Sequence, residues 1–247
     1  MTTLLILGSG PNVLAARGWP RAGFDAILAI NNAWQVRPDW DYLIHPEDFP
    51  PARRPGPIAP HQQIITAEAY VRAQNAHGGF VYAGGTMAFT ASYWALYALR
   101  PKTIAYLGCD MVYPNNTATH FYGAGTADPL RKDITLRNLS AKSARLLATA
   151  TAQGCALVNL STTASRQVFP RATLADLAQP VAPPTLNQSA IQAAQTREAE
   201  LGYMVASGRY WLEQDRFDRA EIDRLDALWL NTLPAALKPG RVSETVA

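Results

Sequence analysis

Short runs of apolar residues recur between residue 4 and residue 160, and each ends at once in glycine, asparagine or another polar residue. Apolar runs of this length, bounded by turn residues, are typical of strands buried on both faces of a parallel sheet. Because the carboxyl ends of parallel strands meet at one edge of the sheet, the polar residues that follow them are expected to share one crevice. The pattern predicts strands at 4–7, 26–30, 42–44, 63–66, 103–107 and 156–160.

Segments with helical character separate several of these strands. We expect a helix after Gly10, since Pro11 is tolerated in a first helical turn, and a second, buried helix that starts at Thr86 and ends before Pro101. A third helix is predicted over 136–152, where alanine and leucine predominate. Strands that alternate with helices favour an α/β fold, Rossmann-like, with a mostly parallel sheet and flanking helices.

The last part of the chain has a different character. Residues 178–190 contain three prolines and are expected to link a Rossmann-like nucleotide-binding domain at 1–177 to a helical C-terminal appendage at 191–247. In the appendage, apolar residues fall at helical spacing among charged ones, an amphipathic pattern that requires a partner surface. That surface is either the sheet domain or a second copy of the chain, so a homo-oligomer through the C-terminal helices stays open.

Composition indicates a globular protein without a membrane span. Of 247 residues, 48% are hydrophobic and 17% charged, and the apolar runs stop well short of the ~20 residues that a bilayer span requires. The first residues lack the basic region of a signal peptide, so we expect a cytoplasmic protein. Cys109 and Cys155 have no CxxC spacing, and we expect both to be reduced and buried.

The net charge of +3 is unevenly distributed along the chain. Residues 191–247 have seven lysines and arginines against nine aspartates and glutamates, which leaves fifteen against ten, or +5, in residues 1–190. This surplus suits a small anionic ligand. It is too dispersed for a nucleic-acid partner, which requires basic residues clustered in one stripe.

The first predicted strand ends in Gly8-Ser9-Gly10-Pro11-Asn12, directly before the first predicted helix. Glycines at such a junction allow backbone amides to approach a phosphate; a tight turn without a ligand is the alternative. The motif is not a dinucleotide fingerprint, because Val13 replaces the third glycine and the second strand ends in Asn31 rather than an acid. Asn31 and Asn32 have amides suited to sugar hydroxyls, or they form a turn.

Two further junctions are candidate binding sites. Gly84-Gly85-Thr86 precedes the buried helix and offers backbone amides to an anion, although a tight turn explains it nearly as well. Gly108-Cys109-Asp110 follows the best candidate for a central strand. An acid at that point is placed to hold a metal, a ribose or an acceptor, unless it only caps the next turn.

Reactive groups are expected in the loop after Asp110. Tyr113, His120 and Tyr122 lie in a segment otherwise poor in core residues. Tyrosine hydroxyls are able to hold a leaving phosphate, and a histidine with an ordinary pKa near ~6.5 is able to take a proton from an acceptor hydroxyl. The alternative is a surface loop whose rings anchor it to the body. We predict His120, Asp110 and Tyr122 as catalytic and Tyr113 as a ligand-binding residue.

The order of these motifs resembles a known group of enzymes, whereas the motifs of P-loop NTPases, zinc metalloproteases and α/β-hydrolases are absent from the sequence. The resemblance is to the bacterial sialyltransferases of glycosyltransferase family 42, and equally to the related fold group of motility accessory factors and archaeal 6-hydroxymethylpterin pyrophosphokinases. It covers roughly residues 4–165. The body of the sequence is more similar still to uncharacterised phage and prophage proteins of the morphogenetic type. The motifs that carry the resemblance are Ile6-Leu7-Gly8-Ser9-Gly10-Pro11-Asn12, Ala29-Ile30-Asn31-Asn32, Gly84-Gly85-Thr86 and Tyr106-Leu107-Gly108-Cys109-Asp110.

The resemblance to the sialyltransferases implies a CMP-activated sugar as the donor substrate, bound at the turn of residues 8–12. It places Asn31 near the donor and Gly84-Gly85 near the donor's carboxylate or phosphate. It further implies inverting transfer to an acceptor that the sequence does not identify, with phenols on the leaving phosphate and no required metal or other cofactor.

One departure from the family pattern concerns the base. In the family it is a histidine shortly before the helix that here begins near Leu136, and Asp133-Ile134-Thr135-Leu136 contains none. His120 lies where the family tends to place a phosphate-binding tyrosine. Either His120 has a different role here, or Tyr122 replaces that tyrosine, or the chemistry differs.

Two alternatives to glycosyl transfer follow from the same resemblances. A pyrophosphokinase-like transferase uses Mg-ATP, with Asp110 as a metal ligand and the glycine turns on the phosphates, and it requires no histidine base. A non-catalytic, phage-derived assembly protein is the other alternative.

Overall fold

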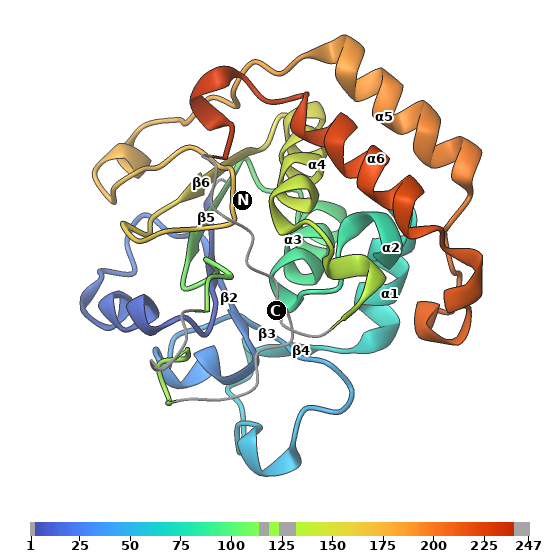
Figure 1. Ribbon diagram of the computed structural model, residues 1–247. Helices are drawn as coiled ribbons and strands as arrows, with labels where there is room; N and C mark the ends of the chain where they lie inside the picture. Colours follow the sequence, from blue (N-terminus) through green and yellow to red (C-terminus); the bar gives the residue numbers. More distant parts are fainter. Residues whose placement is uncertain (1–2, 114–118, 124–131, 240–247) are drawn as a thin grey trace.

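The computed structural model describes residues 3–113, 119–123 and 132–239. In this part of the chain, six parallel strands form a single sheet in the order β4-β3-β2-β1-β5-β6 (Figure 1). All six strands predicted from the apolar runs are present, which confirms the α/β Rossmann-like fold. Their bounds are β1 Thr3–Leu7, β2 Ala26–Ile30, β3 Tyr42–Ile44, β4 Gln63–Ile65, β5 Thr103–Leu107 and β6 Ala156–Asn159.

The chain builds the sheet outward from β1 in both directions. It runs first through β2, β3 and β4 to one edge, then returns to place β5 on the other side of β1 and β6 beyond it. The strand order therefore reverses between β1 and β5, and ligands of open α/β sheets bind at such a switch point, outside the carboxyl ends of the strands.

The α-helices lie together on one face of the sheet (Figure 1). Side chains such as Leu4 and Ile6 of β1 point into the core on this face, whereas Leu5 and Leu7 point into a second core on the other, as the two-residue period of a strand requires. The second core is covered by 3-10 helices and loops rather than by α-helices. The helices are α1 Ala67–Ala76, α2 Phe80–Ala83, α3 Met87–Ala98, α4 Leu139–Ala152, α5 Gln188–Leu201 and α6 Arg219–Leu230.

Two helix predictions need correction, and two helices were not predicted. The segment after Gly10 is the 3-10 helix η1 (Pro11–Gly18) rather than an α-helix. The helix predicted over 136–152 begins at Leu139, where the Asn138 side chain accepts a hydrogen bond from the Ala141 amide. Helices α1 and α2 were not predicted, since α1 buries few large apolar side chains and α2 is a single short turn.

The C-terminal helices pack on the sheet body. Helix α6 lies against α4, and α5 lies against α6, on the outer side of the molecule (Figure 1). Two ion pairs join them to α4: Lys142 Nζ lies 3.0 Å from Asp226 Oδ1, and Arg145 Nε lies 2.7 Å from Glu198 Oε1. The amphipathic face predicted for this region thus has the sheet domain as a partner surface, and α5 starts within the segment 178–190 that was expected to be a linker.

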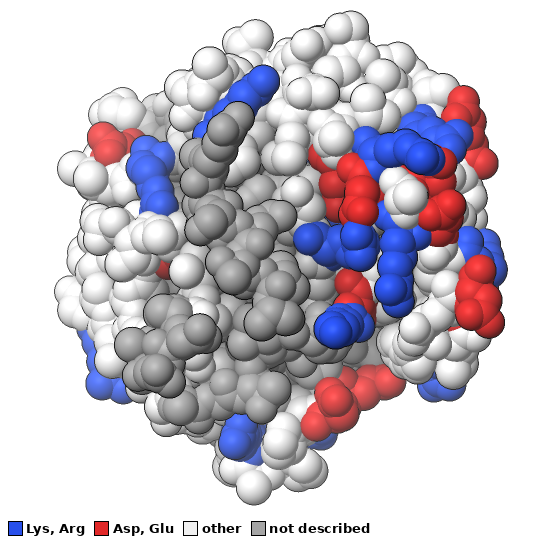
Figure 2. Space-filling view, in the orientation of Figure 1, with Lys and Arg blue, Asp and Glu red and all other residues white. Residues whose placement is uncertain are grey.

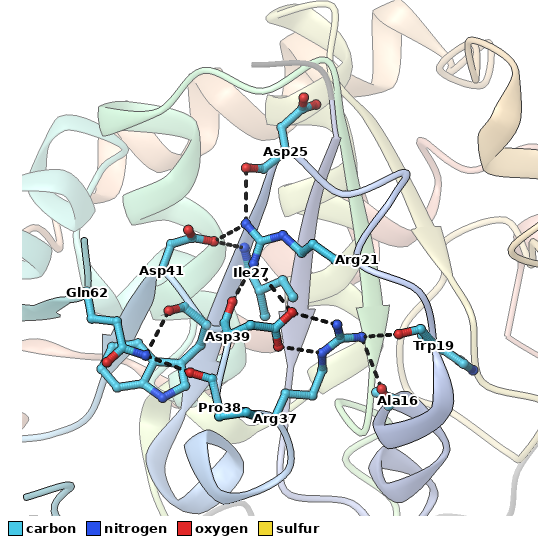
Figure 3. Close-up of polar contacts among 11 residues, drawn as sticks. Ala16, Trp19, Arg21, Asp25, Ile27, Arg37, Pro38, Asp39, Asp41 and Gln62 are labelled. Atoms are coloured by element: carbon cyan, nitrogen blue, oxygen red, sulfur yellow. Dashed lines mark hydrogen bonds and ion pairs between the residues drawn. The ribbon is translucent and has the colours of Figure 1, made fainter. Parts of the chain in front are cut away.

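A polar network closes the amino ends of the strands, away from the switch point (Figure 3). Asp41 Oδ2 accepts hydrogen bonds from the Ile27 amide and from Arg21, both at 2.7 Å. Arg37 is buried, donates to backbone carbonyls at the end of η1, and pairs with Asp39 at 2.7 Å, a hydrogen bond that lowers the pKa of the Asp39 carboxyl. The network therefore ties η1 to the β2 and β3 edge as a structural clamp.

Within the described residues, none of the helices combines the length and the apolar character needed to cross a membrane. On the face seen in Figure 2, lysine and arginine are interspersed with aspartate and glutamate on the side where the helices lie.

Candidate functional site

A cleft of about 1570 Å³ opens beyond the carboxyl ends of the strands. It is larger than the ~300–1,000 Å³ of an ordinary small-molecule site, which leaves room for two substrates side by side. Every residue that the sequence singled out, with the exception of Gly84, lines this one cleft. These residues are Gly8, Ser9, Gly10, Pro11, Asn12, Asn31, Asn32, Gly85, Thr86, Asp110, Tyr113, His120 and Tyr122.

The glycines of the first turn serve the packing of two backbone segments. The Gly8 amide donates to Leu107 O and the Gly10 amide to Gly108 O, both at 2.8 Å. A Cβ on Gly8 would lie 2.7 Å from Cys109 Sγ, and one on Gly10 would lie 3.0 Å from Gly108 O. The turns after β1 and β5 therefore approach each other closely. Because the amides of Gly8 and Gly10 already have acceptors, a phosphate at this turn requires other donors, and the predicted phosphate site stays a prediction.

Three buried side-chain oxygens in the same region have no hydrogen-bond partner in the described part of the chain. They are Ser9 Oγ, Asn12 Oδ1 and Asn31 Oδ1. Asn31 also has a backbone φ of 52°, a left-handed conformation that is uncommon outside glycine and often found at functional sites. Because buried polar atoms in proteins are nearly always paired, unpaired ones in residues that line a cleft indicate a place completed by a ligand or by ordered water.

Asp110 forms the floor of the cleft and is held by neighbouring side chains. Its carboxylate accepts hydrogen bonds from Asn12 Nδ2 at 2.8 Å, from Asn159 Nδ2 at 3.2 Å and from Thr163 Oγ1 at 3.2 Å. Asp110 is buried, and these three partners come from η1, from β6 and from the loop after β6. The carboxylate thus holds the ends of β1, β5 and β6 in fixed relative positions. Capping the next turn, the alternative to a catalytic role, would not require these contacts.

The amino end of α3 opens into the cleft. Thr86, where the helix was predicted to start, caps it by accepting a hydrogen bond from the Phe89 amide at 3.3 Å. Met87 and Ala88 line the cleft, and their amides have no acceptor among the described residues. A helix start with free amides favours negative charge. Gly84 does not share this role, since it faces the core beside Phe89.

The loop segment 119–123 lies on the first glycine turn. The Phe121 amide donates to Ser9 O at 2.9 Å, and the Phe121 ring packs against the second core. The rings of His120 and Tyr122 stack with their centroids 4.9 Å apart, and the ring centroid of Tyr113 lies 6.2 Å from that of His120. Phe121 therefore anchors the segment 119–123, as the alternative interpretation expected, and in doing so brings His120 and Tyr122 to the cleft, near Tyr113.

His120 has the electrostatic properties of a neutral base. Burial, and secondarily the positive charge of Arg53, lower the pKa of His120 from 6.5. Its Nδ1 lies 2.9 Å from Thr119 Oγ1, which leaves Nε2 for another partner. The imidazole is therefore uncharged at neutral pH and able to accept a proton.

Sequence reasoning missed one wall of the cleft, which the segment between α5 and α6 supplies through residues 206–211. The adjacent Arg209, Tyr210 and Trp211 were a usable signal, because aromatic and basic residues in a loop are typical of binding surfaces.

Sequence reasoning also overestimated the positive charge of the cleft. Among the described residues, five carboxylates and three arginines line the cleft: Glu47, Asp48, Glu68, Asp110 and Asp133 against Arg53, Arg72 and Arg209.

Within the described residues, no group of three or more histidines, cysteines, aspartates or glutamates is placed to hold a metal ion. A Mg²⁺ ion that arrives on nucleotide phosphates requires only one or two carboxylates, and Asp110 is the one at the floor of the cleft.

No family model, curated protein or solved structure matches this chain. The resemblance to glycosyltransferase family 42 and to the related fold group therefore stays a prediction, and the arguments below depend on the geometry of the cleft.

Proposed function

We propose that the cleft binds a nucleotide-activated sugar and transfers the sugar to a second substrate. The observation that carries this proposal is the set of oxygens of Ser9, Asn12 and Asn31 that have no partner among the described residues, in the same cleft that the first residues of α3 line. Ribose hydroxyls and an exocyclic base amine are donors that these oxygens accept, and the free amides of α3 attract the phosphate. The choice of CMP as the nucleotide rests on the resemblance to the sialyltransferases.

In the proposed reaction, a hydroxyl oxygen of the acceptor attacks the anomeric carbon of the donor. The bond between that carbon and the phosphate oxygen breaks, CMP leaves with the electron pair, and the configuration inverts. His120 Nε2 takes the proton of the acceptor hydroxyl, because the lowered pKa of His120 keeps the ring neutral. Tyr113 and Tyr122 donate hydrogen bonds to the departing phosphate, which stabilises its developing charge.

Ligand-dependent thermal stability tests the nucleotide. CMP, CDP, UDP, ATP and GDP are compared with and without Mg²⁺, and a ligand at about 100 times its Kd raises the free energy of unfolding by ~2.7 kcal/mol. Stabilisation by CMP without metal supports the proposal. Stabilisation only by ATP with Mg²⁺ replaces it with (pyro)phosphoryl transfer, and no stabilisation by any nucleotide replaces it with an assembly function.

A glycine at position 31 separates the side chain from the backbone effect. Asn31→Gly keeps the left-handed conformation and removes the amide, so we expect unchanged folding and a loss of the CMP-induced shift. Arg100→Gly is the matched control, because Arg100 also has a positive φ, of 49°, but does not line the cleft. Equal CMP shifts in the two variants would remove Asn31 from the binding site.

Release of CMP from a CMP-sugar tests the base. We expect His120→Ala to fold normally and to lower turnover by at least ~100-fold, the usual contribution of a positioned general base. His61→Ala, at an exposed histidine outside the cleft, is the control and keeps full turnover. Turnover by His120→Ala at the level of this control would exclude His120 as the base.

A further inference from the structure

Residues 206–211, here called the second wall, are held in place by contacts with the body of the protein. Asn75 Nδ2 of α1 donates to Ala206 O at 2.7 Å, and Tyr210 donates from its hydroxyl to Asp133 Oδ2 at 2.8 Å. Gly208 has a φ of 73° and packs so closely on Val71 that a Cβ there would lie 3.0 Å from the valine side chain. The second wall is thus preformed and does not wait for a ligand to order it.

An indole ring stands at the edge of this wall. Trp211 lines the cleft, is 53% exposed, and has the buried ring of Tyr210 against it at 5.4 Å in an edge-to-face arrangement. Exposed tryptophans beside a cavity are common in binding sites, because a large rigid face is offered at a low cost in conformational entropy. A flat, apolar ring face is the natural partner for that surface.

Two arginines of the same region have no carboxylate partner in the described residues. Arg72 on α1 and Arg209 on the second wall both line the cleft and are exposed. The nearest carboxylate on α1, that of Glu68, forms no ion pair with Arg72, and Asp133 is occupied by Tyr210. Arg137, Arg145, Arg197, Arg216 and Arg224, by contrast, each pair with a carboxylate.

We propose that α1 and the second wall form a subsite for a second substrate that is ring-shaped and negatively charged, such as a sugar that carries a carboxylate or a phosphate. Trp211 packs on a face of the ring, and Arg72 and Arg209 bind the anionic group. Asn75 Oδ1, which is buried and has no partner in the described part of the chain, is the nearby acceptor for a hydroxyl. The inference rests on the proposed function in one respect: the ligand of this subsite is taken to be the acceptor of the transferred sugar.

A matched series of ligands tests the subsite without any nucleotide. Glucose, glucuronate and glucose 6-phosphate share one ring and differ in the group on carbon 5, and their affinities for the full-length protein are measured by saturation-transfer NMR. We expect the two anions to bind at least about tenfold more tightly than glucose, with the stronger of them identifying the carboxylate or the phosphate as the natural group. A preference below threefold, or no binding of any of the three at about 10 mM, overturns the proposal.

Variants connect the preference to the named residues. Arg209→Gln and Arg72→Gln each reduce the preference for the anions, whereas Arg219→Gln, an exposed arginine outside the cleft, leaves it unchanged. Trp211→Ala weakens all three ligands, and Leu212→Ala does not, since Leu212 is the 70% exposed neighbour that does not line the cleft. Equal effects of Trp211→Ala and Leu212→Ala, or a preference that survives both arginine substitutions, overturn the assignment.

The outcomes separate this subsite from the nucleotide site. Selective binding of the anionic sugars without stabilisation by CMP keeps the subsite and removes the proposed transfer from CMP. Stabilisation by CMP without selective sugar binding keeps the proposed function and removes the subsite.

Discussion

Lys142 and Asp226 form an ion pair that is almost completely excluded from water. The two side chains are 1% and 2% exposed, and Nζ lies 3.0 Å from Oδ1. The second carboxylate oxygen has no partner among the described residues. Burial raises the pKa of Asp226 even though Lys142 opposes the shift, which indicates that the loss of hydration outweighs the attraction between the two charges.

This balance predicts that removing one charge of the pair lowers the stability of the fold much more than removing both. Lys142→Met leaves the Asp226 carboxylate buried without a cation, so we expect the free energy of unfolding to fall by about 3 to 5 kcal/mol. For a protein of this size, such a loss lowers the melting temperature by about 6 to 20 °C. The double variant Lys142→Met, Asp226→Ala removes both charges and is expected to recover most of this loss, since apolar replacements of buried pairs are often neutral.

Urea unfolding of the wild type, both single variants and the double variant gives the coupling energy of the pair. Tryptophan fluorescence is a suitable signal, because Trp229 of α6 is buried close to Asp226 in the sequence. Arg137→Met is the control. It breaks a more exposed ion pair between Arg137, which lies just before α4, and Asp223, and we expect it to lower the free energy of unfolding by about 1 kcal/mol or less. A Lys142→Met loss as small as the control's, or single losses that simply add in the double variant, would refute the reasoning.

Three further predictions follow from the cleft and its supports. Turnover that depends on His120 is expected to fall as the pH drops through its lowered pKa, below 6.5, because protonation removes the base; a midpoint above 6.5 contradicts this. Gly8→Ala is expected to destabilise the fold by about 1 to 3 kcal/mol in urea unfolding, since the added methyl presses on Gly108 and Cys109, and an unchanged midpoint contradicts the close approach of the two turns. Burial raises the pKa of Cys109, and that of Cys155 to about 12, so iodoacetamide at pH 8 is expected to label neither thiol until the protein unfolds, as measured by mass spectrometry.

The sheet was predictable because β2, β5 and β6 are buried along their whole length and β1 nearly so. Residues 104–107 form an unbroken hydrophobic run after Thr103, and Gly108 marks its end. The same rule located most of the cleft, since residues at the carboxyl ends of parallel strands converge whatever their separation along the chain. Helix α1 escaped prediction because alanines and polar residues form most of its buried stripe, which gives little periodic contrast.

Neither the second wall nor the packing role of Gly8 and Gly10 could be predicted from local sequence patterns. Asn75 and Ala206, whose contact holds the wall, are 131 positions apart, and no spacing rule connects them. Gly8 and Gly10 form a motif that suits a phosphate equally well, but their amides are taken by carbonyls about a hundred positions away, at the end of β5. Predicting which acceptor an amide meets requires the strand order, and the sequence pattern does not contain it.

The connection between α5 and α6 has a consequence for engineering. The strand ends that form the floor of the cleft depend on the sheet, whereas the rim at 206–211 is one short, contiguous stretch of chain. Randomising that stretch, with Gly208 and Tyr210 retained as its supports, offers a library that alters ligand choice and leaves the sheet intact. Deleting the chain after residue 177 is a poor route to the same end, because Lys142 and Arg145 would lose their counter-ions and α4 would lose its cover.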